Sequence, residues 1–389
     1  MSRPVSRHRL ARPAVCLNVA MLIALVANAA WAQVTPAAGY TPPDDTPSIK
    51  LGAVIFADYT YQQKPTATDA DGNQINSSSF NVTRAYINVT GNVSHLVAFR
   101  ITPDVVRASV PGTSLDGSIT FRIKYAFAQI NLDDWMWKGT WVRLGIQQTP
   151  YIDFMEGIYR YRFQGTIFEE REGYMSSSDA GISFRTAFPK NYGEVHVGFY
   201  NGENYNKPEV NDQKAVMIRG TFRPLPMHSF LRGWRVTGFY IGDNYIRNSE
   251  RRRAILNTTF EHKYLNVGFD YLDTKDQTSA KPTTNDLHGK GWAFWMTPKL
   301  PHRANGSSWE LLLRYDHLRP NDEVTPVGGT TAPGHGLNER TIAGLAYWFP
   351  KQSSVSAALM FDVENVMFSD YTPSKPTQQK LFLHGLISF

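Results

Sequence analysis

The last ten residues of the chain alternate between apolar and polar side chains with a period of two. Leu381, Leu383, Ile387 and Phe389 share one parity, and only Gly385 interrupts that apolar row. The opposite parity is mainly polar: Lys380, His384 and Ser388, with Phe382 and Leu386 as exceptions. A strand with one apolar face that ends on an aromatic residue is typical of the closing strand of an outer-membrane β-barrel. An edge strand of a soluble β-sandwich would show the same alternation, so the rest of the chain must decide.

The first 32 residues have the layout of a secretory signal peptide. Basic residues without any acidic neighbour precede an apolar run over 15–26, and Ala30-Trp31-Ala32 follows. We expect cleavage after Ala32, a flexible lead-in over 33–48 and a barrel over 49–389. The apolar run is too short for a spanning helix, which needs ~20 apolar residues. Because the lone cysteine, Cys16, lies in this leader, the mature chain would hold neither disulfides nor thiolate metal sites.

Removal of the leader also changes the charge of the chain. The formal net charge falls from +6 to +2 when the four leader arginines are removed, so the basic balance gives no support to a nucleic-acid partner. The chain has 13% aromatic and only 19% charged residues. An exported chain of this composition without helical spans suits a barrel, in which half of each strand faces lipid.

Alternation interrupted by Gly, Pro, Asn and Asp predicts about sixteen strands. They lie at 49–62, 79–93, 95–104, 118–132, 141–149, 179–188, 193–200, 213–224, 234–242, 250–261, 264–273, 289–298, 308–318, 338–349, 353–365 and 378–389. Tight connections such as 92–95 and 262–264 alternate with long polar ones such as 63–78 and 319–337. This alternation matches the short periplasmic turns and long outer loops of bacterial barrels. We therefore predict an all-β fold, a transmembrane antiparallel β-barrel of about 16 strands.

A barrel of this size leaves an aqueous lumen unless something fills it. In the strand over 118–132, one apolar row is expected to face lipid: Ile119, Phe121, Ile123, Tyr125 and Phe127. The opposite parity faces inward, and the same argument on the other strands gives an anion pathway lined by Arg84, Arg100, Arg122, Lys124, Arg143, Arg185, Arg219, Arg314 and Arg340. Three further cations share inward parity: Lys50, Arg235 and Lys380.

Fewer acids share the inward parity: Asp58, Glu194, Asp270, Glu310, Asp316, Asp362 and Glu364. An excess of cations in the wall favours anions, because charges that line a lumen set its selectivity. The alternative for each arginine is that it pairs with a lumenal acid or with a loop. A one-residue bulge would reverse every later assignment on its strand.

The longest connection, 150–178, is rich in aromatic residues, which a purely solvated loop would not need. We expect it to fold into the pore and narrow it, through the constriction residues Tyr159, Arg160, Tyr161, Arg162, Glu169, Glu170 and Arg171. The alternatives are a loop packed against a neighbouring subunit or one that caps the barrel from outside.

Four segments resemble the phosphate-selective porin O and P family: 80–86 (FNVTRAY), 98–104 (AFRITPD), 142–151 (VRLGIQQTPY) and 168–171 (FEER). The sequence IQQ at 146–148 stands where the family often shows Gln-Phe-Lys, so one lysine is missing. The resemblance implies a trimeric porin of sixteen strands with a constricting third loop and a basic lumen.

Catalytic signals are weak throughout the sequence. The histidines form no metal-ligand spacing and no nucleophile or phosphate-loop motif occurs, so we predict no catalytic residue, no metal and no cofactor. Asp270 with Asp273, or Asp316 with His317, could form an acid/base pair at the rim, but strand-end charges are common in any barrel.

Two further groups of residues are expected near the membrane surfaces. Arg251, Arg252 and Arg253 are expected near the outer rim, either solvated or in contact with anionic lipopolysaccharide. A girdle of tryptophans is expected at the membrane interface: Trp135, Trp137 and Trp141.

The predicted function is an outer-membrane porin for passive diffusion of small solutes, preferably anions such as phosphate. Its expected partners are outer-membrane lipid and lipopolysaccharide, small anionic or polar solutes and, by the resemblance, two further copies in a homotrimer. The alternative is a non-conducting outer-membrane barrel that acts as an enzyme or as a structural or adhesive protein.

Overall fold

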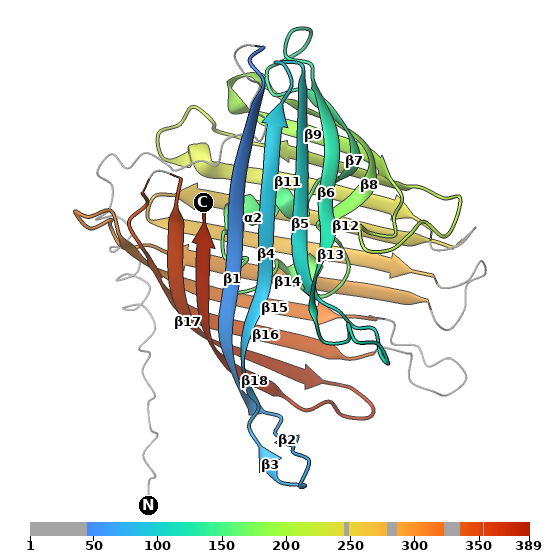
Figure 1. The fold of residues 1–389 in the computed structure, drawn as a ribbon, viewed down its shortest axis with the longest axis vertical. Helices are drawn as coiled ribbons and strands as arrows, with labels where there is room; N and C mark the ends of the chain where they lie inside the picture. Colours follow the sequence, from blue (N-terminus) through green and yellow to red (C-terminus); the bar gives the residue numbers. More distant parts are fainter. Residues whose placement is uncertain (1–44, 245–248, 278–285, 323–334, 353) are drawn as a thin grey trace, which may run out of the picture.

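The computed structural model describes residues 45–244, 249–277, 286–322, 335–352 and 354–389. Sixteen antiparallel strands close into a barrel, in which β1 pairs with both β4 and β18 (Figure 1). The predicted fold class is therefore confirmed. The expected signal peptide, 1–32, lies outside the described residues, as does most of the lead-in over 33–48.

Each of the sixteen predicted strands corresponds to one observed strand, with ends displaced by a few residues. The barrel strands are β1 (Ser48–Lys64), β4 (Ser78–Asn92), β5 (Val97–Arg107), β6 (Ile119–Asn131), β7 (Trp141–Gln148), β8 (Ser178–Ala187), β9 (Gly193–Tyr200), β10 (Ala215–Phe222), β11 (Trp234–Asp243), β12 (Arg251–His262), β13 (Leu265–Asp276), β14 (Leu287–Pro298), β15 (Ser308–Arg319), β16 (Leu337–Trp348), β17 (Ser356–Ser369) and β18 (Gln378–Ser388). A small hairpin, β2 (Ala67–Thr68) with β3 (Gln74–Ile75), extends from the β1–β4 connection. Two short 3₁₀ helices, η1 (Pro189–Asn191) and η2 (Leu231–Gly233), lie in turns.

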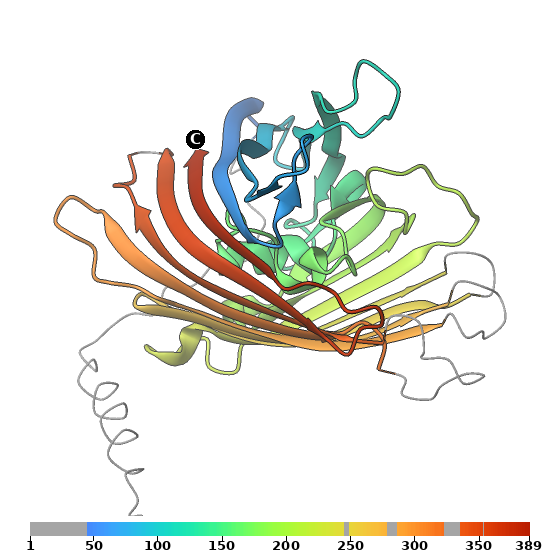
Figure 2. The ribbon, with the colours of Figure 1, turned by 90° about the horizontal axis from the view of Figure 1, so that it is seen from below.

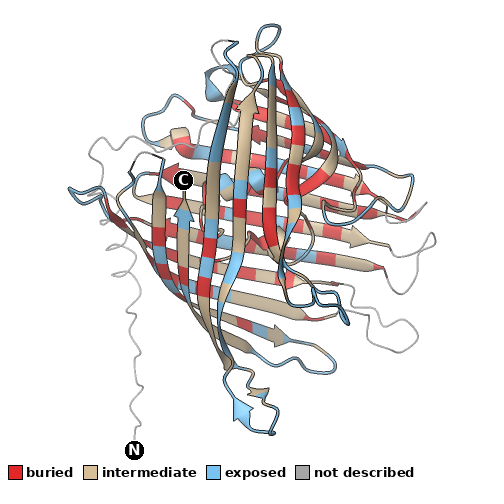
Figure 3. Cartoon of the chain, viewed as in Figure 1, coloured by how far each residue is buried: buried red, intermediate tan, exposed pale blue. Residues whose placement is uncertain are grey.

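The outer surface of the barrel is apolar, and the burial of side chains alternates along the strands (Figure 3). On β18, Leu383 and Ile387 are exposed on the outside, whereas His384 between them is buried inside. The backbone of Phe389 continues this strand, because its N–H and C=O both pair with Ala53 of β1. The C-terminal alternation thus closes the barrel, in which every described strand of the ring has a neighbour on each side. None of the helices in the described residues is long and apolar enough to cross a membrane.

A bulge in β6 makes part of the lipid-facing prediction wrong. Thr102 of β5 pairs with Tyr125, but the next residue, Pro103, pairs with Ile123, which leaves Lys124 as an extra residue. Proline has no N–H to donate to the ladder, so a bulge opposite it is physically reasonable. Beyond the bulge the parity reverses, and Tyr125 and Phe127 are 5% and 9% exposed inside the barrel. The prediction holds for the residues before the bulge, which are exposed on the outer surface: Ile119, Phe121 and Ile123.

The predicted tryptophan girdle is wrong for one of its three members. Trp135 and Trp137, in the turn between β6 and β7, are exposed. Trp141 is buried instead, because it pairs with the inward residues Asn131 and Arg185 on the neighbouring strands.

Candidate functional site

The connection 149–177 lies inside the ring of strands (Figure 2). It contains two helices, α2 (Ile152–Tyr159) and α3 (Phe168–Arg171). Most of the aromatic side chains of this loop are buried: Tyr151, Tyr159, Tyr161, Phe163 and Phe168. Burial of one aromatic ring contributes roughly 2–3 kcal/mol, which explains why a loop in this position carries so many of them.

The aromatic residues of the loop pack on one sector of the inner wall. Tyr159 contacts Trp295 of β14, with ring centroids 5.3 Å apart, and Phe163 contacts Trp348 of β16 at 5.9 Å. At the start of the loop, the Tyr151 ring lies 5.3 Å from Phe239 of β11. The wall from β11 to β18 therefore forms the docking surface of the loop.

Lumenal acids on this sector bind the loop. The Tyr151 hydroxyl donates to Asp270 Oδ1 on β13 at 2.5 Å, and the Tyr161 hydroxyl donates to Glu310 Oε2 on β15 at 2.8 Å. Arg160 also pairs with Glu310, at 3.3 Å. These contacts cover carboxylates that would otherwise face the lumen.

The second half of the loop is held by ion pairs to β16 and β17. Arg171 Nη1 lies 2.9 Å from Glu364 Oε2. Arg340 of β16 pairs with Glu172 of the loop and, at 3.5 Å, with Glu364. Arg314 of β15 pairs with Asp316 and donates to the Thr166 carbonyl oxygen at 2.8 Å. Arg314 and Arg340 were expected to line the anion pathway, but both lie beneath the loop in ion pairs.

Glu169 is a fully buried carboxyl in this interface. Burial, together with the charge of nearby Asp270, raises the pKa of Glu169 well above its usual range. The Tyr151 hydroxyl has one proton, which it donates to Asp270, and the Tyr151 oxygen also lies 3.3 Å from Glu169 Oε1. A protonated Glu169 can donate to that oxygen, so the neutral form of Glu169 fits this geometry.

Arg162 joins the two helices of the loop. It pairs with Glu156 of α2 and, at 2.7 Å, with Glu170 of α3. Burial alone would raise the pKa of Glu170, but the charge and hydrogen bond of Arg162 outweigh it, and the pKa is lowered. This clamp keeps Glu170 ionised and fixes the loop as one body.

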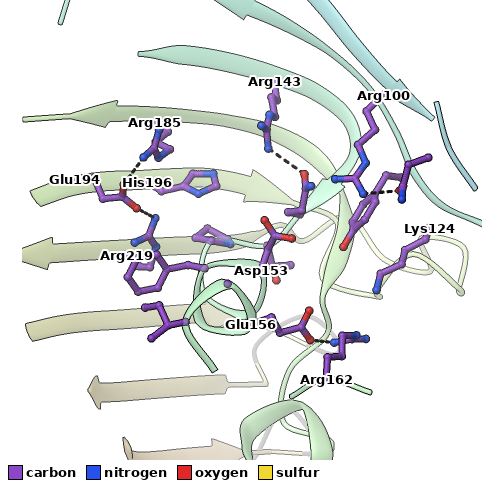
Figure 4. A pocket seen from close by; sticks show the side chains of 18 of the residues that line it. Arg100, Lys124, Arg143, Asp153, Glu156, Arg162, Arg185, Glu194, His196 and Arg219 are labelled. Atoms are coloured by element: carbon purple, nitrogen blue, oxygen red, sulfur yellow. Dashed lines mark hydrogen bonds and ion pairs between the residues drawn. The ribbon is translucent and has the colours of Figure 1, made fainter. Parts of the chain in front are cut away.

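A cavity of about 470 Å³ separates the loop from the opposite wall. Its lining comes from β1, from the strands β4 to β11 with the turn after β10, and from the loop, chiefly helix α2. Among the described residues, its basic members outnumber its acidic ones; the basic members are Arg100, Lys124, Arg143, Arg162, Arg185, Arg219, Arg223 and Arg235, and the acidic ones are Asp153, Glu156 and Glu194. Figure 4 shows several of these cations along the wall that faces Asp153 and Glu156 of α2.

Three cations of this wall, Arg100, Lys124 and Arg143, are held by neutral partners. Arg100 donates to Asn88 and Thr102 at 2.8 and 2.9 Å, and the Lys124 ammonium donates to the Tyr86 hydroxyl at 3.1 Å. Arg143 donates to Gln129 and Gln148 at 2.7 and 3.0 Å. In the described part of the chain, no carboxylate oxygen lies within 4.0 Å of these three side chains. We call these three residues the cationic triad.

The remaining predicted cations of the pathway are neutralised to different degrees. Arg185 and Arg219 share Glu194, which bridges them. Arg84 and Arg122 share the buried Asp104, at 3.1 and 3.4 Å. Arg122 lines two further cavities, of about 700 and 380 Å³, and Arg84 lines the smaller of the two.

Sequence reasoning missed several residues of this cavity. Tyr125 and Trp141 were expected outside, and Asp104 was not recognised as a lumenal acid. Arg100 and Thr102 on the same strand gave the signal for Asp104, because residues separated by an even number of positions face the same side of a strand. His196, between Arg185 and Arg219 in Figure 4, carried no motif at all.

The imagined acid/base pairs are not formed, since their members face opposite sides of the wall. Asp270 is buried inside the barrel, whereas Asp273 lies on the outer face in an ion pair with Arg252 at 3.2 Å. Asp316 is likewise buried, while His317 stacks on the outward Trp292. No group of three or more His, Cys, Asp and Glu side chains arranged to hold a metal occurs in the described residues.

The basic run at the start of β12 forms ion pairs at the rim. Arg251 pairs with Asp243 at 3.2 Å and Arg253 with Asp276 at 2.8 Å, and both arginines are buried. Only Arg252 is directed to the outside.

No family model and no curated protein matches the chain. Solved structures share its fold at very low identity. OmpF of Salmonella typhi, in complex with daunomycin, has a TM-score of 0.57 and 11% identity over 88% of this chain and 97% of that chain. The outer membrane channel DcaP of Acinetobacter baumannii has a TM-score of 0.53 and 10% identity, over 90% of this chain and 100% of that chain. OmpT of Vibrio cholerae, in its trimer form, has a TM-score of 0.51 and 10% identity, over 89% of this chain and 100% of that chain.

These likenesses establish the fold alone. The closed barrel of sixteen strands and its apolar outer face locate the protein in the bacterial outer membrane.

Proposed function

We propose that the protein is an outer-membrane porin that lets small solutes diffuse passively and prefers anions. The observation that carries this proposal is the cationic triad, which lines the cavity with neutral partners only. Charges on a low-dielectric wall raise the local concentration of counter-ions, so uncompensated cations favour anions.

The position of the loop supports the same proposal. Five of the seven predicted lumenal acids lie on β13 to β17, and contacts with the loop hold Asp270, Glu310 and Glu364. The loop thus covers the acidic sector and leaves the basic sector, β5 to β11, facing the cavity. A loop in this position narrows the lumen and makes the basic wall the surface that a passing solute meets.

The test is the zero-current potential of single channels in a planar bilayer with a potassium chloride gradient. The wild-type channel should prefer chloride, and the preference should weaken as salt rises, because the Debye length is about 10 Å at 0.1 M. Joint replacement of the triad by glutamine should shift the potential towards cation preference. Arg252→Gln, on the outer face, is the control. A barrel without conductance would favour the structural or enzymatic alternative.

We further propose a homotrimer, which the family resemblance implies and which the trimer form of Vibrio cholerae OmpT makes a natural first model. Chemical cross-linking of the protein in native outer membranes, followed by denaturing electrophoresis, should give bands with the masses of one, two and three chains. A single band with the mass of one chain would contradict the trimer without affecting the proposed channel.

A further inference from the structure

The cations of the triad are stacked on aromatic rings. The Arg143 guanidinium carbon lies 3.9 Å from the Trp141 ring centroid and 4.6 Å from that of Phe127. The guanidinium carbon of Arg100 lies 4.5 Å from the Tyr125 centroid. Stacking covers a face of the guanidinium group and leaves its in-plane N–H donors for a ligand.

Each of the two guanidinium groups keeps one terminal nitrogen for a ligand. Arg143 uses Nε and Nη1 for Gln129 and Gln148, and Nη2 makes no hydrogen bond within the described part of the chain. Arg100 likewise uses Nε and Nη2, which leaves Nη1. Neither nitrogen belongs to the buried polar atoms that lack a partner, so both keep contact with solvent in the cavity. A planar carboxylate accepts such in-plane donors well.

The same cavity offers an apolar surface to the remainder of a ligand. Val54, Phe56, Phe154 and Ile158 line it beside the rings of the triad. Phe154 projects from α2 and stacks on the Arg219 guanidinium carbon at 3.9 Å. A ligand with a flat apolar body would contact these side chains and displace water from them.

Charge alone does not select between monoanions and dianions in this cavity. Asp153 lines the cavity from the helix that faces the triad, and its side chain is exposed. A dianion is repelled by this carboxylate, and attracted by the cations of the wall, about twice as strongly as a monoanion at the same distance, so selection against phosphate rests on the shape and chemistry of the lining and not on charge. Lys124 is the one lysine among the lining residues, so the described wall offers stacked guanidinium groups rather than a cluster of compact ammonium groups.

We propose that the passage favours organic monocarboxylates with a planar apolar body over inorganic phosphate. The carboxylate binds the free donors of Arg100 and Arg143, and the apolar body lies against Tyr125 and Phe154. This inference rests on the proposed function, because it names the class of anion that the same passage carries.

The experiment compares permeabilities through single channels, with sodium chloride on one side of the bilayer. The other side holds sodium benzoate, sodium acetate or sodium phosphate at a pH where the dianion dominates. Benzoate should permeate about threefold better than acetate in spite of its larger size, because only its ring contacts the aromatic lining. It should also permeate better than phosphate.

Two variants separate the contributions of the ring and of the guanidinium group. Phe154→Leu keeps an apolar side chain without the ring and should lower the benzoate-to-acetate ratio towards one. Arg143→Lys keeps the charge without the planar donors and should lower the ratio of either carboxylate to chloride. Phe121→Leu, which removes a ring from the lipid face, is the matched control and should leave every ratio unchanged.

An anion-selective channel that passes acetate or phosphate at least as well as benzoate would overturn this inference and leave the proposed function standing. A channel that prefers cations, or a barrel that does not conduct, would overturn the proposed function and this inference together.

Discussion

The hydroxyl group of Tyr151 lies 2.5 Å from the Asp270 carboxylate, to which it donates across 119 positions of the chain. This hydrogen bond joins the first residues of the inserted loop to β13, on the sector of the wall that the loop covers. Glu169, from the second helix of the loop, meets the same hydroxyl oxygen at 3.3 Å. The three side chains fix both halves of the loop to one point of the wall.

Tyr151→Phe should loosen the loop. The change leaves the buried Asp270 without this donor, which costs about 1–3 kcal/mol. We expect noisier single-channel currents and a lower temperature for the shift from the folded to the unfolded band on a gel. Tyr315→Phe removes a hydroxyl that binds Glu339 on the outer face and serves as the control. Unchanged current noise in Tyr151→Phe would contradict the anchoring role.

The seating of the loop should depend on pH through Glu169. Its pKa is raised above the ordinary value of 4.5, because burial and Asp270 disfavour the charged form. Folding therefore favours the protonated carboxyl, and the stability that it contributes is fully present below the ordinary pKa. That stability is lost as pH rises through the raised pKa.

Glu169→Gln, a neutral side chain of the same shape, should remove this part of the pH dependence. Thermal unfolding and channel noise, measured from acidic to alkaline pH on the wild type and the variant, test the point. Parallel pH profiles for the two proteins would show that Glu169 does not control the loop.

Glu194→Gln should strengthen anion preference, because Glu194 neutralises both Arg185 and Arg219 on the cavity wall. The variant exposes the passage to two further cations, and we expect the chloride-to-potassium permeability ratio to rise roughly twofold. Glu339→Gln on the outer face is the matched control. An unchanged ratio in Glu194→Gln would mean that the two arginines do not face the ion path.

The strands were predictable because each repeats one local rule, alternation with a period of two. Leu383 and His384 fall on opposite faces as that rule requires. The reversal at Lys124 was not predictable in the same way, since it depends on Pro103 of the neighbouring strand. Register across two strands is a property of their pairing and not of either sequence alone.

The site was harder to predict than the fold, because the loop decides which inward residues meet the lumen. Arg143 and Arg314 have the same parity argument behind them, yet Arg314 lies under the loop and Arg143 lines the cavity. If the inward charged residues had been grouped by strand, the sequence would have indicated which sector of the wall binds the loop. Most of the acids cluster on β13 to β17, which is where the hydroxyl and guanidinium groups of the loop bind.

The bulge gives a direct test of register on β6. Phe121 faces outward before the bulge and Tyr125 faces inward after it. An arginine on the lipid face costs about 2–4 kcal/mol near the membrane midplane, whereas one in the lumen is tolerated. Phe121→Arg should therefore impair assembly more than Tyr125→Arg, as measured by the yield of folded, heat-modifiable protein in outer-membrane fractions. The opposite ranking would mean that inward and outward side chains alternate along β6 without a bulge.

Phe389→Gln should impair assembly of the barrel more than it alters conductance. The backbone of Phe389 pairs with Ala53 in both directions, so the last residue belongs to the seam between β18 and β1. Phe389 is 54% exposed and does not belong to the lining of the cavity. A glutamine keeps the backbone pairing but presents a polar side chain where an aromatic one suits the membrane interface. The yield of folded protein should fall, while the channels that do form should keep wild-type conductance and selectivity.

Phe349→Gln, which changes a half-exposed aromatic residue in the turn after β16, is the control for a general loss of apolar surface. Equal losses of folded protein in the two variants would show that the terminal position has no special role in closing the barrel.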